Sequence, residues 1–120
     1  MSEKEQTINQ YFQLSDQASK SQAALHSIIE LFADDAEIFS ATGETCAGTK
    51  AITNFFTDFF NRNVKLKHLC HVFMADNHYK AEWAVSGQKK TGDLFALHGY
   101  DTYEFDSTNH IKYLKVTIAN

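Results

Sequence analysis

The spacing of apolar residues changes once along the chain, from three- and four-residue steps in the first half to alternation in the second. The three- and four-residue steps predict two N-terminal helices. The first covers about residues 4–18 and has a narrow apolar stripe that includes Tyr11. The second opens at a capping box formed by Ser19 and Gln22 and ends near residues 33–35. Both helices have an apolar side that must cover another layer.

A third helix has the strongest pattern in the sequence. It is preceded by a short predicted strand at residues 36–41, and Thr49 is its expected N-cap. Its apolar residues recur at the spacing of a single helix face, and they are Ile52, Phe55, Phe56, Phe59 and Phe60. Four phenylalanines on one face need a large apolar surface to pack against, such as the concave side of a curved sheet.

Beyond Val64 the helical spacing disappears and alternation predicts four strands. They cover about residues 64–76, 78–87, 92–106 and 110–119, with Asp, Asn, Ser and Gly in the turns between them. Sequential strands joined by short turns form an antiparallel meander. We therefore expect one α+β domain over residues 1–120: a cone-shaped, strongly curved antiparallel sheet wrapped around the long third helix, with two further N-terminal helices. The open end of such a cone is a natural small-molecule pocket.

One strand carries a carboxylate on an otherwise apolar face. In the 92–106 segment, Asp101 shares a face with Phe95, Leu97, Gly99 and Tyr103. A buried carboxyl group must be hydrogen-bonded, protonated or open to a cavity. Two interpretations stay open: an acid that donates a hydrogen bond to a ligand oxygen, or a structural carboxylate satisfied by its neighbours.

Composition narrows the classes of function. The net charge of -4 argues against a nucleic acid or an anionic membrane as partner, because both require clustered Lys and Arg. The polar N-terminus does not resemble a signal peptide, and no apolar run approaches the roughly 18 residues of a membrane span. Cys46 and Cys70 lack Cys-x-x-Cys spacing and fit a reducing compartment. We therefore expect a cytoplasmic protein.

The histidines do not predict a metal site. His68 and His71 are an odd number of residues apart, so a regular strand points them to opposite faces. We expect no metal and no cofactor. His68 shares its predicted face with Cys70, which makes it a candidate second ionisable group in the cavity, with a satisfied core histidine as the alternative. Trp83 is interpreted either as core or as pocket wall.

Three runs of sequence carry a resemblance to a known family. They are LFADDA at 31–36, AGTKAITNFF at 47–56 and GYDTYEF at 99–105. In this order the chain resembles the nuclear-transport-factor-2-like superfamily (NTF2-like, with a cystatin-like α+β roll), particularly the SnoaL-like and ketosteroid-isomerase-like proteins. That superfamily includes isomerases, dehydratases, cyclases and non-catalytic binding modules, so the resemblance implies a fold more specifically than a reaction. It also implies a homodimer formed through the open face of the sheet.

The isomerases allow a comparison residue by residue. Asp101 resembles the protonated aspartic acid of their oxyanion hole, and Tyr11 resembles its tyrosine. The LFADDA run aligns Ser40 with the aspartate that acts as general base. A serine hydroxyl of ordinary pKa does not take a proton from carbon at neutral pH, so ketosteroid isomerisation itself is not expected.

We predict that the protein binds a small, largely apolar molecule in the cone cavity, which could extend to lyase, isomerase or cyclase chemistry. The predicted catalytic residues are Asp101, His68 and Tyr11, and the predicted ligand contacts are Phe55, Phe59, Trp83, Leu97, Tyr103 and Ser40. The alternative is a non-catalytic binding or assembly module whose pocket is filled by its own aromatic side chains.

Overall fold

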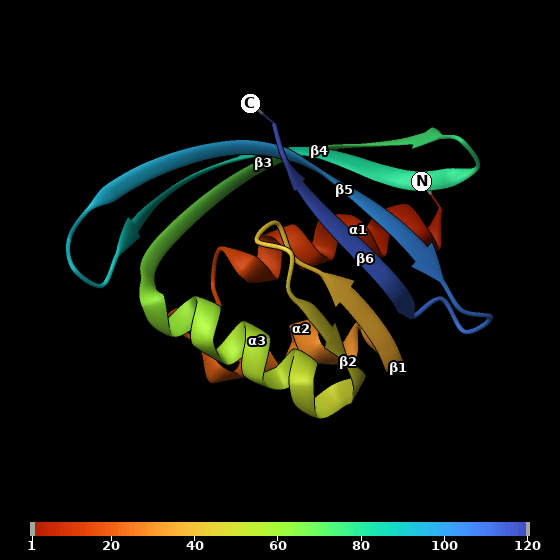
Figure 1. Ribbon diagram of the computed structural model, residues 1–120, viewed down its shortest axis with the longest axis horizontal. Coiled ribbons are helices and arrows are strands. Elements are labelled where there is room, and N and C mark those ends of the chain that lie inside the picture. The colour runs from red at the N-terminus through yellow and green to blue at the C-terminus, as the bar shows by residue number, and fades with distance from the viewer. Residues whose placement is uncertain (1, 120) are drawn as a thin grey trace.

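The computed structural model of the protein describes residues 2–119 and has an α+β fold with three helices and one curved, unclosed sheet (Figure 1). Along the chain the elements are α1 (Glu3–Ser15), α2 (Gln22–Glu30), β1 (Phe32–Phe39), β2 (Thr45–Ala47), α3 (Gly48–Arg62), β3 (Asn63–Ala75), β4 (His78–Lys89), β5 (Leu94–Phe105) and β6 (Ile111–Ile118). The predicted fold class is confirmed. Within the described residues, no helix is long and apolar enough to span a membrane.

The six strands form one sheet in the order β2-β1-β6-β5-β4-β3. Strands β3 to β6 make the predicted antiparallel meander, and Figure 1 shows the long strands arching over the helices. The alternation did not predict that β1 joins β6 in parallel, with Ile38 opposite Leu114. This pairing places β1 beside the end of the meander and leaves β3 as the far edge strand.

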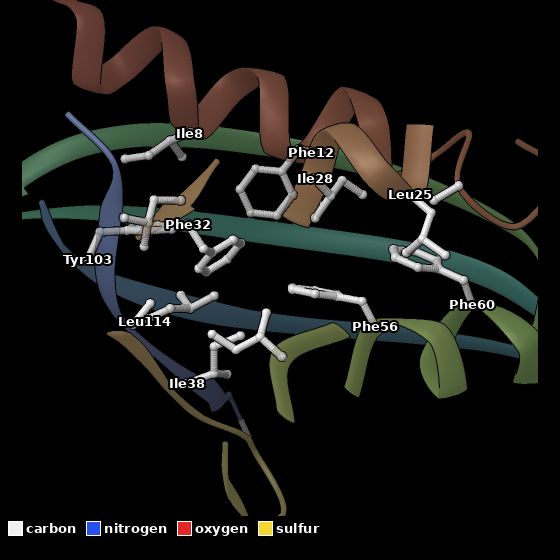
Figure 2. Packing of buried hydrophobic residues seen from close by; sticks show 14 of the residues in the cluster. Ile8, Phe12, Leu25, Ile28, Phe32, Ile38, Phe56, Phe60, Tyr103 and Leu114 are labelled. Atoms are coloured by element: carbon white, nitrogen blue, oxygen red, sulfur yellow. The ribbon is translucent and has the colours of Figure 1, made fainter. Parts of the chain in front are cut away.

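The core fills the space between α3 and the sheet. Ile52, Phe56 and Phe60 from α3 are buried, and the rings of Phe56 and Phe60 stack with centroids 6.0 Å apart. Figure 2 shows Phe56 pointing from α3 toward Phe32 of β1 and Phe12 of α1. The predicted apolar face of the third helix is therefore correct, and it is packed against side chains from the other helices as well as from the sheet.

Both predicted boundaries of the second helix are wrong. The N-cap of α2 is Ser21, whose side chain accepts the backbone N–H of Ala24 at 3.1 Å, and not Ser19. The same helix ends at Glu30, before the predicted 33–35, because Phe32 already pairs with Ile111 of β6. Strand pairing between distant segments therefore overrides the local helical pattern.

The third helix begins one residue before its predicted cap. β2 pairs with β1 as far as Ala47, so the chain must turn at once into α3. Gly48 makes this turn with a φ of +86°, a conformation that glycine adopts without steric cost. The hydroxyl of Thr49 donates instead to the carbonyl oxygen of Asp34 at 3.4 Å, so it links α3 to β1 and does not cap the helix.

Candidate functional site

Asp101 lies at the centre of the inner face of β5. It is opposite Ala81 of β4 and Val116 of β6, and only 2% of its surface is exposed. The indole Nε1–H of Trp83 donates to its Oδ1 at 2.9 Å, and the hydroxyl of Tyr103 donates to its Oδ2 at 2.7 Å. Each carboxyl oxygen therefore has a donor from the chain itself, and the group is enclosed.

Burial dominates the proton affinity of this cluster. It raises the pKa of Asp101 to about 7, although the hydrogen bonds from Tyr103 and Trp83 act in the opposite direction. At neutral pH the carboxyl group is therefore close to half protonated. Burial and the nearby charge of Asp101 also raise the pKa of Tyr11 and of Tyr103, so both phenols keep their protons. The cluster can hold a proton or release it near pH 7.

Gly99 allows the indole of Trp83 to reach Asp101. Trp83 is directly opposite Gly99 in the β4–β5 ladder, and Asp101 is two residues further along β5. A Cβ atom on residue 99 would lie 2.5 Å from Cζ2 of the indole and 2.4 Å from the carbonyl oxygen of Thr117. The indole therefore lies across the bare backbone of Gly99. In the sequence, Gly99 was assigned only to the face of Asp101, although a glycine inside a strand is a recognised sign of close approach.

Tyr11 approaches the cluster from α1. Its ring makes an edge contact with the ring of Tyr103, with centroids 6.4 Å apart, and similar contacts with Phe32 and Phe56. The hydroxyl that the structure places on Asp101 is that of Tyr103. Tyr11 is therefore a neighbour of the acid within an aromatic cluster, and its predicted catalytic role stays a prediction.

His68 is paired with a residue that the sequence analysis did not identify. Its Nδ1 lies 2.7 Å from Oδ1 of Asp16, and its backbone N–H donates to the same oxygen at 2.9 Å. The His68 side chain is 11% exposed and that of Asp16 is 23% exposed. Burial lowers the pKa of His68, while the hydrogen bond and charge of Asp16 oppose that shift. At neutral pH the imidazole is therefore uncharged.

An open cleft of about 650 Å³ runs between α1 and β3, beside this pair. It is lined by residues of α1, the residue that follows it and two residues of β3, namely Gln6, Asn9, Gln10, Phe12, Gln13, Asp16, His68 and Cys70. Cys70 lies opposite Trp83 in the β3–β4 ladder. Burial raises the pKa of Cys70, and the charges of Asp101 and Asp16 add to this shift. Cys70 is therefore close to both the cleft and the buried acid.

The other predicted ligand contacts lie away from this cleft. Leu97 is on the inner face of β5 but is 45% exposed. Ser40 lies after β1, where its hydroxyl is 3.0 Å from that of Thr42 and accepts the N–H of Glu44 at 3.2 Å. Phe55 and Phe59 are partly buried at the edge of the α3 core. The structure thus gathers Trp83, Tyr103 and Tyr11 around Asp101, and contact of the remaining residues with a ligand stays a prediction.

Among residues 2–119, no cluster of three or more His, Cys, Asp or Glu side chains is arranged to hold a metal ion. The polar groups that the fold brings together can donate, accept or exchange protons.

Comparison with known proteins gives a family and a fold. A sequence model described as a SnoaL-like domain matches residues 16–113. An NTF2-like protein of unknown function from Exiguobacterium sp. 255-15 is 25% identical, with a TM-score of 0.88 over 95% of this chain and 98% of its own. No curated protein sequence matches the chain significantly.

Two further solved structures share the fold at lower identity. A candidate polyketide cyclase from Xanthomonas campestris pv. campestris is 15% identical, with a TM-score of 0.81 over 98% of this chain and 90% of its own. The epoxide hydrolase/cyclase-like enzyme SalBIII, named for a role in pyran ring formation in the polyether salinomycin, is 13% identical, with a TM-score of 0.79 over 97% and 90%. At these identities the likeness establishes the fold alone.

Proposed function

This chain belongs to the SnoaL-like domain family, and we propose that it binds a small, largely apolar molecule in the cleft between α1 and β3. The observation that carries the proposal is the cleft itself. Its volume of about 650 Å³ falls within the range of small-molecule sites. The ring of Phe12 and the thiol of Cys70 supply apolar surface, and His68 supplies a polar group at a fixed position.

Acid–base chemistry is the second part of the proposal. Asp101, with a pKa of about 7, and the uncharged imidazole of His68 are both able to exchange a proton at neutral pH. Lyase, isomerase and cyclase reactions need such an acid and base beside one ligand. Asp101 would have to release Trp83 or Tyr103 before it could contact that ligand. A ligand in the cleft therefore contacts Asp101 only if one of these two hydrogen bonds opens.

The enclosure of Asp101 favours a second candidate function, a binding module without catalysis. Its carboxyl group is 2% exposed, and both oxygens accept hydrogen bonds from the chain. Phe56 and Phe60 occupy the interior between α3 and the sheet. In this alternative the interior is filled by the protein's own aromatic side chains, and a ligand in the cleft leaves Asp101 unchanged.

A homodimer through the outer face of the sheet completes the proposal. Leu69 of β3 is 74% exposed and Tyr100 of β5 is 40% exposed. Both lie on the face opposite Asp101, where Nε2 of His98 also lies 2.6 Å from Oε2 of Glu82. Large exposed apolar side chains on one sheet face are typical of a contact surface. A second copy of the chain presents the same mixture of apolar and polar groups, as a twofold contact requires.

Backbone amide NMR with 4-ethylanisole, a neutral apolar probe, tests the binding proposal. We expect shift changes in α1 and around His68 and Cys70. The Gln13→Trp variant places a large side chain in the cleft and should remove these changes. Gln17→Trp is the matched control, because Gln17 is also exposed but does not line the cleft. Absent shift changes, or changes that survive Gln13→Trp, would contradict the proposal.

The same spectra separate the two candidate functions. If the probe shifts the indole N–H of Trp83, the cleft communicates with the Asp101 cluster, as the acid–base version requires. If the probe binds in the cleft while the Trp83 signal stays in place, the non-catalytic module is favoured. Trp83 is the single tryptophan of the chain, so its indole signal is unambiguous in the wild type.

A further inference from the structure

We infer that the Asp16–His68 pair makes the cleft a receptor for an uncharged hydroxyl group, which donates its hydrogen bond to Nε2 of His68. The inference rests on the proposed function, because it assigns the ligand class of the same cleft. The ligand would be a neutral alcohol or phenol with an apolar body. Asp16 would be a positioning residue, acting on the ligand through the imidazole.

The hydrogen bonds of Asp16 determine which ring nitrogen carries the proton. Oδ1 of Asp16 accepts the backbone N–H of His68 at 2.9 Å and lies 2.7 Å from Nδ1, so the same oxygen is the acceptor for the ring as well. Nδ1 therefore carries the hydrogen. In an uncharged imidazole the other nitrogen, Nε2, then has a lone pair and can only accept. Nε2 can therefore accept a hydrogen bond from a ligand that carries a donor. A ligand group that can only accept cannot bond to this nitrogen.

The surroundings hold the ring in one orientation. The ring of Phe12 lies near the imidazole, with centroids 5.4 Å apart, and the bond between Nδ1 and Asp16 holds the Nδ1 edge of the ring. Asp16 is itself held at the end of α1, where its N–H donates to the carbonyl oxygen of Phe12 at 3.3 Å. A carboxylate is disfavoured at the C-terminal end of a helix dipole. Its two donors on His68 offset that cost.

Asp16 also has a structural role, which accounts for only one of these bonds. β3 is an edge strand of the sheet, and an N–H on a free edge needs a partner. The bond from the backbone N–H of His68 meets that need. The second bond, from Nδ1, contributes nothing to edge pairing and instead sets the protonation pattern of a ring that borders an open cleft.

The lining of the cleft selects the charge of the ligand. Among residues 2–119, the side chains that line it include no Lys or Arg, so an anion would lack a counter-charge. Asp16 is the one carboxylate, and it is already engaged by His68. The amides of Gln10 and Gln13 can donate or accept, which suits neutral polar groups. Phe12 and Cys70 offer the apolar part of the surface.

A cycle of two ligands and two proteins tests the inference. The ligands are 4-ethylphenol, which has a hydroxyl donor, and 4-ethylanisole, in which a methyl group replaces that hydrogen. The proteins are the wild type and His68→Phe, and comparing the two affinity ratios cancels the difference in ligand hydrophobicity. We expect the preference for the phenol to be about 2- to 12-fold greater in the wild type, the value of one hydrogen bond. Equal ratios in the two proteins would overturn the inference.

The protonation pattern of His68 provides a test that needs no variant. In the free wild type, ¹⁵N NMR of the imidazole should show a protonated Nδ1 and a bare Nε2, and 4-ethylphenol should shift the Nε2 signal. Asp16→Asn keeps an oxygen acceptor and should retain both the pattern and the phenol preference. Asp16→Ala should lose both. A proton on Nε2 in the free wild type would refute the inference.

The two compounds also separate the role of His68 from ligand binding in the cleft. If neither compound binds, the proposed function fails and the inference fails with it. If both bind in the cleft but show the same ratio in the wild type and in His68→Phe, the proposed function survives and the role of His68 is wrong.

Discussion

The substitution Asp101→Asn should change the way the stability of the protein depends on pH. An asparagine has nearly the same size as an aspartic acid, and its carbonyl oxygen can still accept the indole N–H of Trp83. Its amide group can donate to the hydroxyl oxygen of Tyr103 in place of the bond that this hydroxyl now donates. The variant therefore removes a proton-binding group from the core with little change in packing.

The direction of this pH dependence follows from whether the folded or the unfolded chain holds the proton of Asp101. The pKa of Asp101 is raised from its usual 3.8 to about 7 in the folded protein, so between these values the folded chain keeps a proton that the unfolded chain has lost. The free energy of unfolding therefore falls as pH rises through this range, by about 1.4 kcal/mol per pH unit. Across roughly three units the wild type loses on the order of 4 kcal/mol, and above pH 7 the loss is complete. Asparagine, which does not titrate, avoids it.

Urea denaturation of both proteins at a series of pH values measures this effect. The difference between the two free energies of unfolding cancels groups that titrate alike in both, such as His68. We expect Asp101→Asn to gain stability relative to the wild type as pH rises from about 4 to about 7, and then to hold a constant advantage. A difference that is flat with pH would show that the buried carboxyl group keeps its ordinary pKa, and would refute the reasoning from burial.

Two further predictions concern the backbone at Gly99 and the outer face of the sheet. Gly99→Ala places a Cβ 2.4 Å from the backbone oxygen of Thr117 and 2.5 Å from the indole of Trp83. We expect the free energy of unfolding measured in urea to fall by about 1–3 kcal/mol and the fluorescence spectrum of Trp83 to shift. An unchanged spectrum would contradict the role of Gly99 in positioning the indole. Leu69→Lys combined with Tyr100→Lys should convert a dimer into a monomer in analytical ultracentrifugation, whereas His26→Lys, at an exposed position of α2, should not. A monomeric wild type would refute the dimer.

The strand containing Asp101 could be predicted because alternation is a local signal. It placed Asp101, Tyr103 and Gly99 on one face, and all three are buried there. The partners of Asp101 could not be derived in the same way, because alternation does not specify which strand lies alongside. Trp83 is 18 residues away in the sequence and reaches Asp101 only through the β4–β5 register.

The role of Asp16 could not be predicted either, because its partner lies even further away in the sequence. Asp16 lies immediately beyond α1, which ends at Ser15 and not near the predicted residue 18, and its partner His68 is 52 residues further along the chain. The parallel pairing of β1 with β6 is equally non-local. A sequence period describes which residues share a face, whereas these contacts depend on how the faces are assembled. The error in the N-cap of α2 is only local, because the true cap, Ser21, lies two residues after the predicted Ser19.

The position of the cleft follows from the residues that fill the interior. The phenylalanines of α3 predicted a large apolar surface opposite the helix, and that surface could have been a ligand cavity. The structure places Phe56 against Phe60, Phe32 and Tyr11, so the rings pack on one another and on the sheet. Trp83 and Tyr103 enclose Asp101, and the open space lies along the edge strand β3, beside α1. A ligand held there against Cys70 is one strand away from Trp83, and through Trp83 it is two side chains from the buried acid.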